Sequence, residues 1–288
     1  KLDLIIWGAT GFTGQLVSQY INKTYSSTNL KWGIAGRNKE KIFSIAKKLK
    51  INGERVFIAE SKNLESLIKL TSKTKVICTT VGPYAKLGTN LIEACISTGT
   101  DYCDITGETQ WIRRIIDKYH KLAEEKNIKI INSCGFDSIP SDMGVYYYQK
   151  RIFEKTGVYA SMINMRVAGA KGGISGGTYN SLSNVLEEAR VNKDVRKTLI
   201  NPYGLNPIGK QFGPDKHDLQ KIIFDKISKS WIAPFVMAGI NTKIVRRSHA
   251  LIDFKYGSYF SYDEATLTGK GVSCLLYTSD AADDIPRV

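Results

Sequence analysis

Histidines and paired cysteines are scarce in this sequence. Only three histidines occur among 288 residues, and they are dispersed along the chain, so no metal site is predicted. The five cysteines are odd in number and form no Cys-x-x-Cys pair. Cys78, Cys103 and Cys134 stand in apolar, strand-like runs, which is typical of reduced core thiols in a reducing compartment. A disulfide framework is therefore not expected.

The sequence also lacks the patterns that accompany nucleic acids and membrane spans. Its net charge is +14, but no dense basic block is interleaved with aromatic residues, so no nucleic-acid partner is expected. No run of about eighteen apolar residues could span a bilayer, and no charged-then-apolar leader opens the chain. These absences favour a location on the cytoplasmic side.

The chain has enough residues and enough hydrophobic side chains, 42% of the total, to form two domains that each have a hydrophobic core. The last segment, SCLLYTSDAADDIPRV, resembles a translated cloning adaptor. We therefore expect residues 273–288 to be non-native and the chain to be truncated.

The most informative stretch is LDLIIWGATGFTG, from Leu2 to Gly14. Its apolar run predicts a strand buried on both faces, and the residues from Gln15 to Ile21 predict a helix. A Gly-x-x-Gly-x-x-Gly turn between them lets the backbone approach a pyrophosphate at the helix N-terminus. The alternative is a glycine-rich turn without a ligand. The residues expected to contact the phosphates are Gly8, Ala9, Thr10, Gly11, Phe12, Thr13 and Gly14.

The second predicted strand, at residues 31–36, is followed by Arg37 and Asn38. In a Rossmann fold this position contacts the adenosine ribose, where an acid would favour the 2′-hydroxyl of NAD. Arg37, helped by Asn38, offers a planar cation for a 2′-phosphate instead, so NADP(H) is the predicted cofactor. The alternative is an ordinary surface arginine at a helix start.

Six predicted strands alternate with helices over residues 1–140, which indicates one doubly wound domain. The fourth predicted strand lies beside the first and is followed by a turn at Val81, Gly82 and Pro83. We expect this turn to form the floor of the nicotinamide half of the binding site. A rigid turn without a ligand is equally compatible with these residues.

Four residues that follow predicted strands could donate or hold a proton. Asp137 and Ser138 lie in the loop after the sixth strand, and Tyr84 follows the fourth. Glu108 follows the fifth strand, and its alternative role is at the N-terminus of the next long helix.

Residues 141–272 are assigned to a second domain with a different pattern. Residues 159–170 predict a strand, and the glycine-rich stretch 169–177 favours a hinge over a second anion-binding turn. Residues 233–247 predict a turn into a strand, with Arg246 and Arg247 at its exposed end.

A rival signal comes from Ser133, Tyr146 and Lys150, whose spacing matches the short-chain dehydrogenases. Such a pair arises easily in a chain rich in tyrosine and lysine, and the segment SIPSDMG is expected to interrupt the helix that should carry it. An atypical short-chain dehydrogenase is therefore kept only as an alternative.

The stretches GATGFTG, IAGRN, TTVGPY, CGFDSIPSDMG, GGISGGT and VRRS resemble, in this order and spacing, the saccharopine dehydrogenase-like oxidoreductase family. That family includes eukaryotic lipid-droplet-associated proteins and mycobacterial trans-acting enoyl reductases. The resemblance covers Leu2 to about Gly271 and implies a Rossmann NADP-binding domain followed by a C-terminally truncated α+β domain. It carries the 2′-phosphate contact onto Arg37 and the nicotinamide-side turn onto residues 81–84, but it assigns no catalytic acid.

The sequence thus predicts an α/β enzyme that uses NADPH to reduce a carbonyl or enoyl group of a hydrophobic, lipid-like substrate. Asp137 or Ser138 is the preferred proton donor, followed by Tyr84 or Glu108. The alternative is a non-catalytic NADP-binding sensor or lipid-droplet adaptor. A lipid-droplet or membrane surface and a second copy of the chain are the expected further partners.

Overall fold

The computed structural model describes residues 1–136, 138–169 and 176–271. By packing, the chain forms two units, each described separately below. Unit 1 comprises residues 1–135 and 175–191, and unit 2 comprises residues 136–174 and 192–288. In the described part of the chain, no helix combines the length and hydrophobicity needed to cross a bilayer.

Unit 1 is built on a six-stranded parallel sheet in the order β3-β2-β1-β4-β5-β6. This order confirms the predicted doubly wound α/β fold, because the strand order reverses between β1 and β4. The strands are β1 (Leu2–Trp7), β2 (Trp32–Gly36), β3 (Val56–Ile58), β4 (Thr74–Thr79), β5 (Asp101–Asp104) and β6 (Ile130–Ile131). Its helices are α1 (Phe12–Thr24), α2 (Lys39–Leu49), α3 (Leu64–Thr71), α4 (Tyr84–Leu87), α5 (Thr89–Thr98), α6 (Thr109–Glu125) and α8 (Gly176–Val191), with a 3₁₀ turn at Gly53–Arg55.

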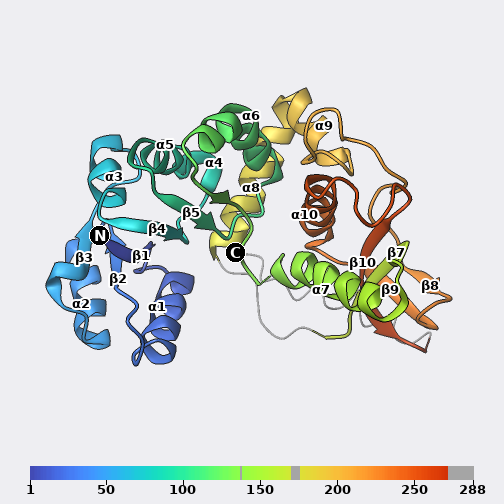
Figure 1. The fold of residues 1–288 in the computed structure, drawn as a ribbon, viewed down its shortest axis with the longest axis horizontal. Coiled ribbons are helices and arrows are strands. Elements are labelled where there is room, and N and C mark those ends of the chain that lie inside the picture. The colour runs from blue at the N-terminus through green and yellow to red at the C-terminus, as the bar shows by residue number, and fades with distance from the viewer. Residues whose placement is uncertain (137, 170–175, 272–288) are drawn as a thin grey trace. The chain divides into compact units, whose positions relative to one another are not determined.

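Helices cover the two faces of this sheet unequally (Figure 1). On one face α1 and α2 pack over β1, β2 and β3, and their core includes Ile6, Ile34 and Ile42. On the other face lie α3, α5 and α6, as right-handed connections between parallel strands require. Alternation along a strand therefore sends Ile5 and Ile6 into different cores, and both are fully buried.

Unit 2 contains a four-stranded mixed sheet in the order β7-β10-β9-β8. Its helices α7 and α10 pack on each other, and Val145, Val245, Phe260 and Tyr262 form a buried core cluster. The elements are α7 (Ile139–Thr156), β7 (Met162–Val167), α9 (Lys193–Ile200), β8 (Ile223–Asp225), β9 (Ser230–Pro234), α10 (Ala238–Leu251) and β10 (Ser261–Gly269).

Two local predictions about unit 2 were wrong. The expected strand over residues 233–247 is largely the helix α10, and Arg246 is buried rather than exposed. Its guanidinium pairs with Asp215 at 2.7 Å and donates to the Tyr262 carbonyl, and these partners are distant in sequence. The segment SIPSDMG does not interrupt a helix either, because Pro140 lies in the first turn of α7, where proline is tolerated.

The division by packing differs from the sequence-based division at residue 140. Helix α8 lies within the stretch that was assigned to the second domain, yet it belongs to unit 1. Its Glu188 accepts hydrogen bonds from Gln110 and Arg114 of α6, at 3.3 and 2.6 Å. These polar contacts attach α8 to the face of unit 1 that α6 covers.

Candidate active site

The glycine turn after β1 is packed so closely that side chains are excluded at two of its positions. Gly8 has a φ of +92°, and a Cβ there would lie 2.6 Å from the Val81 side chain. A Cβ on Gly14 would lie 2.1 Å from the Gly8 carbonyl oxygen. The Gly11 amide donates to that same oxygen at 2.9 Å. The turn therefore needs glycine at positions 8 and 14 to bring α1 directly against the end of β1.

The N-terminus of α1 is open to an anion. Gly11 is the N-cap residue, no side chain caps this end, and the first turn contains no acidic residue. The first amides of a helix have no partner within the helix, and the helix dipole makes this end positive. The amides of Phe12, Thr13 and Gly14 therefore suit the pyrophosphate of a dinucleotide.

Arg37 lies directly after β2 and is exposed, with no ion pair to any residue within the described ranges. Asn38 has a structural task instead: its side-chain oxygen accepts the Lys41 amide at 2.8 Å and caps α2. Thr10 lies near the end of β2, since a Cβ on Gly36 would come within 3.2 Å of its methyl group. Arg37 thus offers an uncommitted cation at this edge of the sheet.

Glu108 fixes the turn that follows β4. Its side chain is fully buried, and its carboxylate accepts the backbone amides of Tyr84 at 2.7 Å and Ala85 at 2.9 Å. The carboxylate therefore caps α4, not α6, whose N-cap position Glu108 also occupies. Ser181 of α8 donates to the same carboxylate at 2.9 Å. The single carboxylate of Glu108 thus connects three parts of unit 1: the turn after β4, the start of α6 and helix α8.

Tyr84, the next predicted proton donor, is buried beside this carboxylate. Its hydroxyl donates to the Thr79 carbonyl at 3.2 Å, and its ring packs on Trp111 with centroids 5.6 Å apart. Burial raises the pKa of the Tyr84 phenol well above its ordinary value, so the group stays protonated. Its proton is engaged within the protein.

The two preferred donors belong to unit 2. Asp137 lies outside the described residues. Ser138 is buried, and its hydroxyl donates to the Asn241 side-chain oxygen at 2.9 Å. Asn241 in turn donates to Glu264 at 3.0 Å, and burial raises the pKa of that carboxyl. Ser138 therefore belongs to a buried polar network whose members lie up to 126 residues apart in the chain.

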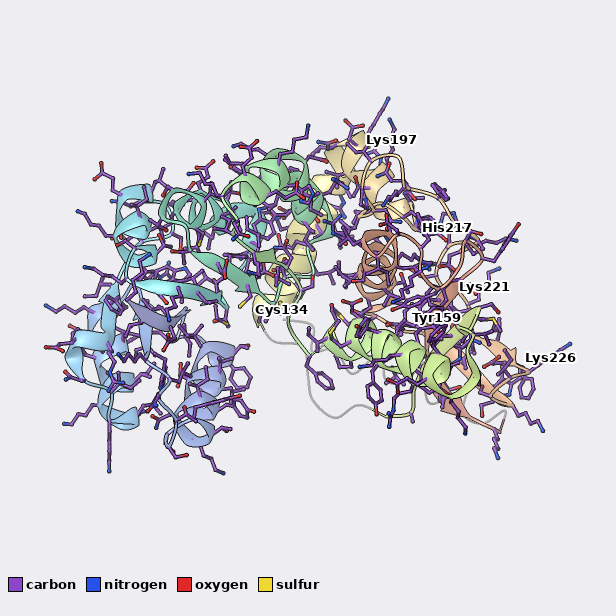
Figure 2. The ribbon with its side chains drawn as sticks, in the orientation of Figure 1. Cys134, Tyr159, Lys197, His217, Lys221 and Lys226 are labelled. Carbon is purple, nitrogen blue, oxygen red and sulfur yellow. The ribbon has the colours of Figure 1, made fainter. Side chains whose placement is uncertain are left out.

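Sequence reasoning missed Asp104, which organises the carboxyl ends of β5 and β6. Its buried carboxylate accepts the Thr106 and Ser133 amides at 3.0 and 2.9 Å, the Tyr102 hydroxyl at 2.8 Å and the Asn132 amide group at 2.7 Å. Burial nevertheless raises its pKa to about 6. The sequence did contain a signal for Asp104, because an acidic residue at the end of a predicted buried strand is a candidate for a functional or organising role. Cys134, labelled in Figure 2, is the residue after Ser133, and its backbone amide donates to the Asp104 backbone carbonyl at 2.7 Å.

The short-chain dehydrogenase pattern gains no supporting contacts. The buried Ser133 hydroxyl donates to the Thr106 carbonyl at 2.7 Å. Tyr146 and Lys150 are exposed on α7, and the Lys150 ammonium lies 4.0 Å from Glu154. None of the hydrogen bonds found between described residues joins Ser133, Tyr146 and Lys150.

The doubly wound sheet, the close-packed glycine turn and the exposed Arg37 define a dinucleotide-binding protein of the Rossmann class. Residues 4–131 match the family model described as the saccharopine dehydrogenase NADP binding domain. This match confirms the predicted NADP-binding domain and the predicted cofactor, NADP.

Similar proteins extend the match beyond this domain. A Mycobacterium tuberculosis protein provisionally named as a trans-acting enoyl reductase is 35% identical over 281 residues, which cover 94% of this chain and 66% of the relative. The trans-acting enoyl reductase of Mycobacterium bovis is 32% identical over 282 residues, with 95% and 67% covered. A solved structure of apo saccharopine dehydrogenase (L-Glu forming) from Saccharomyces cerevisiae matches 59% of this chain and 36% of its own at 16% identity and a TM-score of 0.43.

The chain therefore belongs to the saccharopine dehydrogenase-like family that includes the trans-acting enoyl reductases, as its motifs predicted. It spans about two thirds of the length of these curated relatives.

Proposed function

We propose that the protein is an NADPH-dependent reductase that acts on an enoyl or carbonyl group of a hydrophobic, lipid-like substrate. The observation that carries the proposal is the glycine turn, which excludes side chains at Gly8 and Gly14 and leads into an uncapped helix end. Arg37 at the neighbouring strand end supports NADPH over NADH. The names of the relatives favour an enoyl over a carbonyl group.

In the proposed mechanism the α1 amides hold the pyrophosphate and Arg37 pairs with the 2′-phosphate. NADPH, when bound, supplies a hydride to an electron-poor carbon of the substrate. The turn at Val81, Gly82 and Pro83 lies against the nicotinamide half of the cofactor, and the hydrogen bonds to the Glu108 carboxylate keep this turn in place. A proton must also reach the substrate, and Asp137 or Ser138 remains the proposed source; Ser138 would first have to release its hydrogen bond to Asn241.

Tyr84 and Glu108 are better suited to positioning the turn after β4 than to donating a proton to the substrate. The Tyr84 hydroxyl is already engaged with Thr79, and the Glu108 carboxylate accepts three hydrogen bonds. These observations support roles in holding the site rather than in proton transfer.

A fluorescence titration with NADPH and NADH tests the cofactor site. The expected result is tighter binding of NADPH, and Arg37→Ala should remove that preference because the 2′-phosphate loses its cation. Arg151→Ala is the matched control, since Arg151 is an exposed arginine on α7 that pairs with Glu154. A folded sample that binds neither nucleotide would refute the enzyme proposal.

A non-catalytic NADP-binding sensor or adaptor is the second candidate function. One observation favours it: Tyr84, Glu108 and Ser138 all have their polar groups engaged inside the protein. The two candidates separate on turnover. NADPH oxidation that depends on added medium-chain or long-chain enoyl thioesters supports the reductase, whereas tight binding without oxidation supports the sensor.

We further propose that a lipid-like substrate is met at a lipid-droplet or membrane surface. Flotation with phosphatidylcholine vesicles tests this proposal, and protein that remains wholly in the bottom fraction would contradict it. The proposal of a homo-oligomer is tested by sedimentation at several concentrations.

A further inference from the structure

Two cysteines lie next to each other on the neighbouring strands β4 and β5 of unit 1. Strand register pairs Cys78 with Cys103, and both thiols are free in the structure. Register partners on parallel strands lie about 4.8 Å apart, and their side chains point to the same face of the sheet. The two Cα atoms are therefore within the separation of roughly 4.4–6.8 Å that a disulfide requires.

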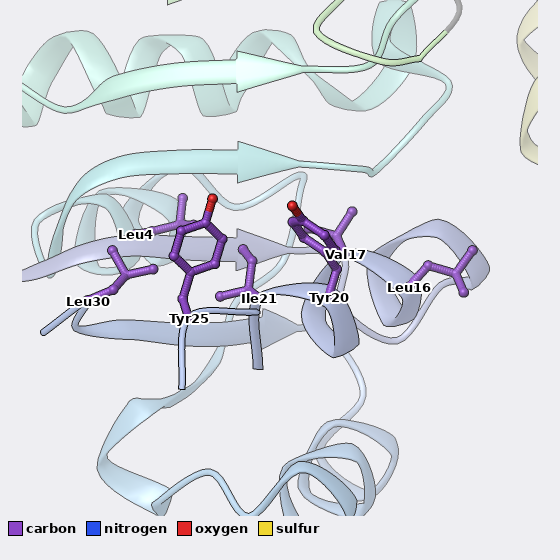
Figure 3. Close-up of a pocket in the computed structure, with 7 residues that line it drawn as sticks. All are labelled: Leu4, Leu16, Val17, Tyr20, Ile21, Tyr25 and Leu30. Carbon is purple, nitrogen blue, oxygen red and sulfur yellow. The ribbon is translucent and has the colours of Figure 1, made fainter. Parts of the chain in front are cut away.

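Cys78 and Cys103 lie on the face of the sheet where α1 packs. Their row begins at Ile6 of β1, which belongs to the core that α1 covers. Leu4 points to the same face, two residues earlier, and it lines an apolar groove together with side chains of α1 (Figure 3). The buried Cys95 belongs to α5, which packs on the opposite face. The sheet therefore separates Cys95 from the pair.

The two paired thiols differ in acidity because one donates a hydrogen bond to the other. The Cys103 thiol donates to the Cys78 sulfur, and this contact lowers the pKa of Cys78. The same hydrogen bond, followed by burial, raises the pKa of Cys103. Since the thiolate is the nucleophilic form of cysteine, Cys78 is the thiol that attacks an electrophile.

The backbone that follows Cys78 is packed against the glycine turn. Thr80 donates its amide to the Trp7 carbonyl at 3.0 Å, at the end of β1. Val81 comes next, and its side chain lies 2.6 Å from where a Cβ on Gly8 would be. A displacement at Cys78 therefore reaches the predicted NADPH site within three residues.

We propose that Cys78 and Cys103 form a reversible disulfide that lowers the affinity of the protein for NADPH. The oxidant is a small peroxide. The Cys78 thiolate attacks a peroxide oxygen, the O–O bond breaks, and Cys78 becomes a sulfenic acid. The Cys103 sulfur then attacks the Cys78 sulfur and the S–O bond breaks. With hydrogen peroxide, the two thiols give up two electrons and two protons in all, and two water molecules are released.

The expected effect on NADPH follows from the geometry of a disulfide. Cβ atoms joined through a disulfide lie about 3.8 Å apart, whereas neighbouring strands lie about 4.8 Å apart. Bridging therefore draws β4 and β5 together by about 1 Å, directly before the turn at residues 79–83. A displacement of about 1 Å is large for a preorganised site, so we expect a loss of NADPH affinity of about tenfold. This effect rests on the proposed cofactor site, whereas formation of the disulfide does not.

Peptide mapping after oxidation tests the disulfide itself. The 288-residue chain is treated with hydrogen peroxide, the remaining thiols are blocked, and the tryptic peptides are analysed by mass spectrometry. Cys95 and Cys103 both lie in the tryptic peptide 87–113, so its fragmentation must assign the bridge. We expect Cys78 bridged to Cys103, with both thiols recovered after dithiothreitol. Cys134→Ser, which removes another half-buried thiol, is the matched control and should form the same bridge.

NADPH titrations of the reduced and oxidised proteins test the effect on the cofactor site. Oxidation should raise the Kd about tenfold in the wild type and in Cys134→Ser, and it should leave the Kd of Cys103→Ser unchanged. Linkage requires the reverse effect as well, because NADPH then favours the dithiol form by the same factor. Saturating NADPH should therefore raise the reduction potential of the pair by about 30 mV in dithiothreitol redox buffers.

The absence of a bridge in oxidised protein, or a bridge from Cys78 to Cys134, would overturn the proposal. Equal NADPH affinities of the reduced and bridged proteins would overturn it too, and so would an equal loss of affinity in oxidised Cys103→Ser. If the reduced protein also failed to bind NADPH, the proposed function would be refuted together with this inference. Tight binding by both forms would refute this inference alone.

Discussion

Replacing Glu108 with glutamine tests whether one buried carboxylate holds the turn after β4. The native group accepts two backbone amides at 2.7 and 2.9 Å and the Ser181 hydroxyl at 2.9 Å. Glutamine keeps the shape, but its NH₂ group must face one of the backbone N–H groups, which is left buried without an acceptor. A lost charge-assisted hydrogen bond and a buried unsatisfied donor together cost about 3 kcal/mol.

Urea unfolding of Glu108→Gln should therefore show a midpoint about 1–2 M below that of the wild type. Glu124→Gln is the matched control, because Glu124 is an exposed acid on α6 that lies 3.5 Å from His120, and such surface pairs contribute about 1 kcal/mol or less. Ser181→Ala removes only the α8 contact, so its loss should be smaller, about 1 kcal/mol.

Ligand binding separates a local effect on the nicotinamide side from a general loss of structure. In Glu108→Gln the affinity for NADPH should fall, whereas adenosine 2′,5′-bisphosphate, which lacks the nicotinamide, should bind as it does to the wild type. A wild-type unfolding midpoint, or an equal loss of both ligands, would refute this reasoning.

Three further changes test the glycine turn and two buried titratable groups. Gly14→Ala should abolish NADPH binding, because its Cβ would lie 2.1 Å from the Gly8 carbonyl oxygen; unchanged affinity in the titration would contradict the close packing. Asp104 has a folded-state pKa raised by burial to about 6, so its contribution to stability is greatest below about pH 4 and is lost as the pH rises through 6. Between about pH 4 and pH 6 the free energy of unfolding of the wild type should fall by about 3 kcal/mol relative to that of Asp104→Asn, as measured by urea titrations at fixed pH. If the free energies of unfolding of the two proteins changed with pH in the same way, the result would contradict this assignment. His249 has its pKa lowered by burial to about 4, so its contribution is present above about pH 6.5 and is lost as the pH falls through 4. His249→Gln should flatten this acid sensitivity in thermal melts, and an unchanged acid slope would contradict the assignment.

The features that were predicted correctly are those encoded over short stretches. The run LIIW and the glycine spacing lie within the first 14 residues, and the strand, turn and helix that they predict depend on neighbours in sequence. Hydrophobic periodicity was likewise enough to predict six alternating strands and helices. The resemblance then identified the family from motifs rather than from the chemistry of the site.

The features that were missed depend on partners far apart in the chain. Glu108 could be suspected of a helix-start role, but its true partners are the amides 24 and 23 residues earlier and a hydroxyl 73 residues later. Arg246 was predicted to lie at the exposed end of a strand, yet Asp215, 31 residues away in the chain, pairs with its guanidinium and makes its burial tolerable. Local pattern carries no signal for either pairing.

The membership of α8 in unit 1 has a consequence for synthesis on the ribosome. Gln110 is translated 78 residues before Glu188, and the intervening chain includes α7 and β7 of unit 2. At about 5–20 residues per second, this separation corresponds to a delay of roughly 4 to 16 seconds. During that interval Glu108 and Gln110 lack their α8 partners, so the nucleotide-binding unit completes its fold only after part of its neighbour has already been made.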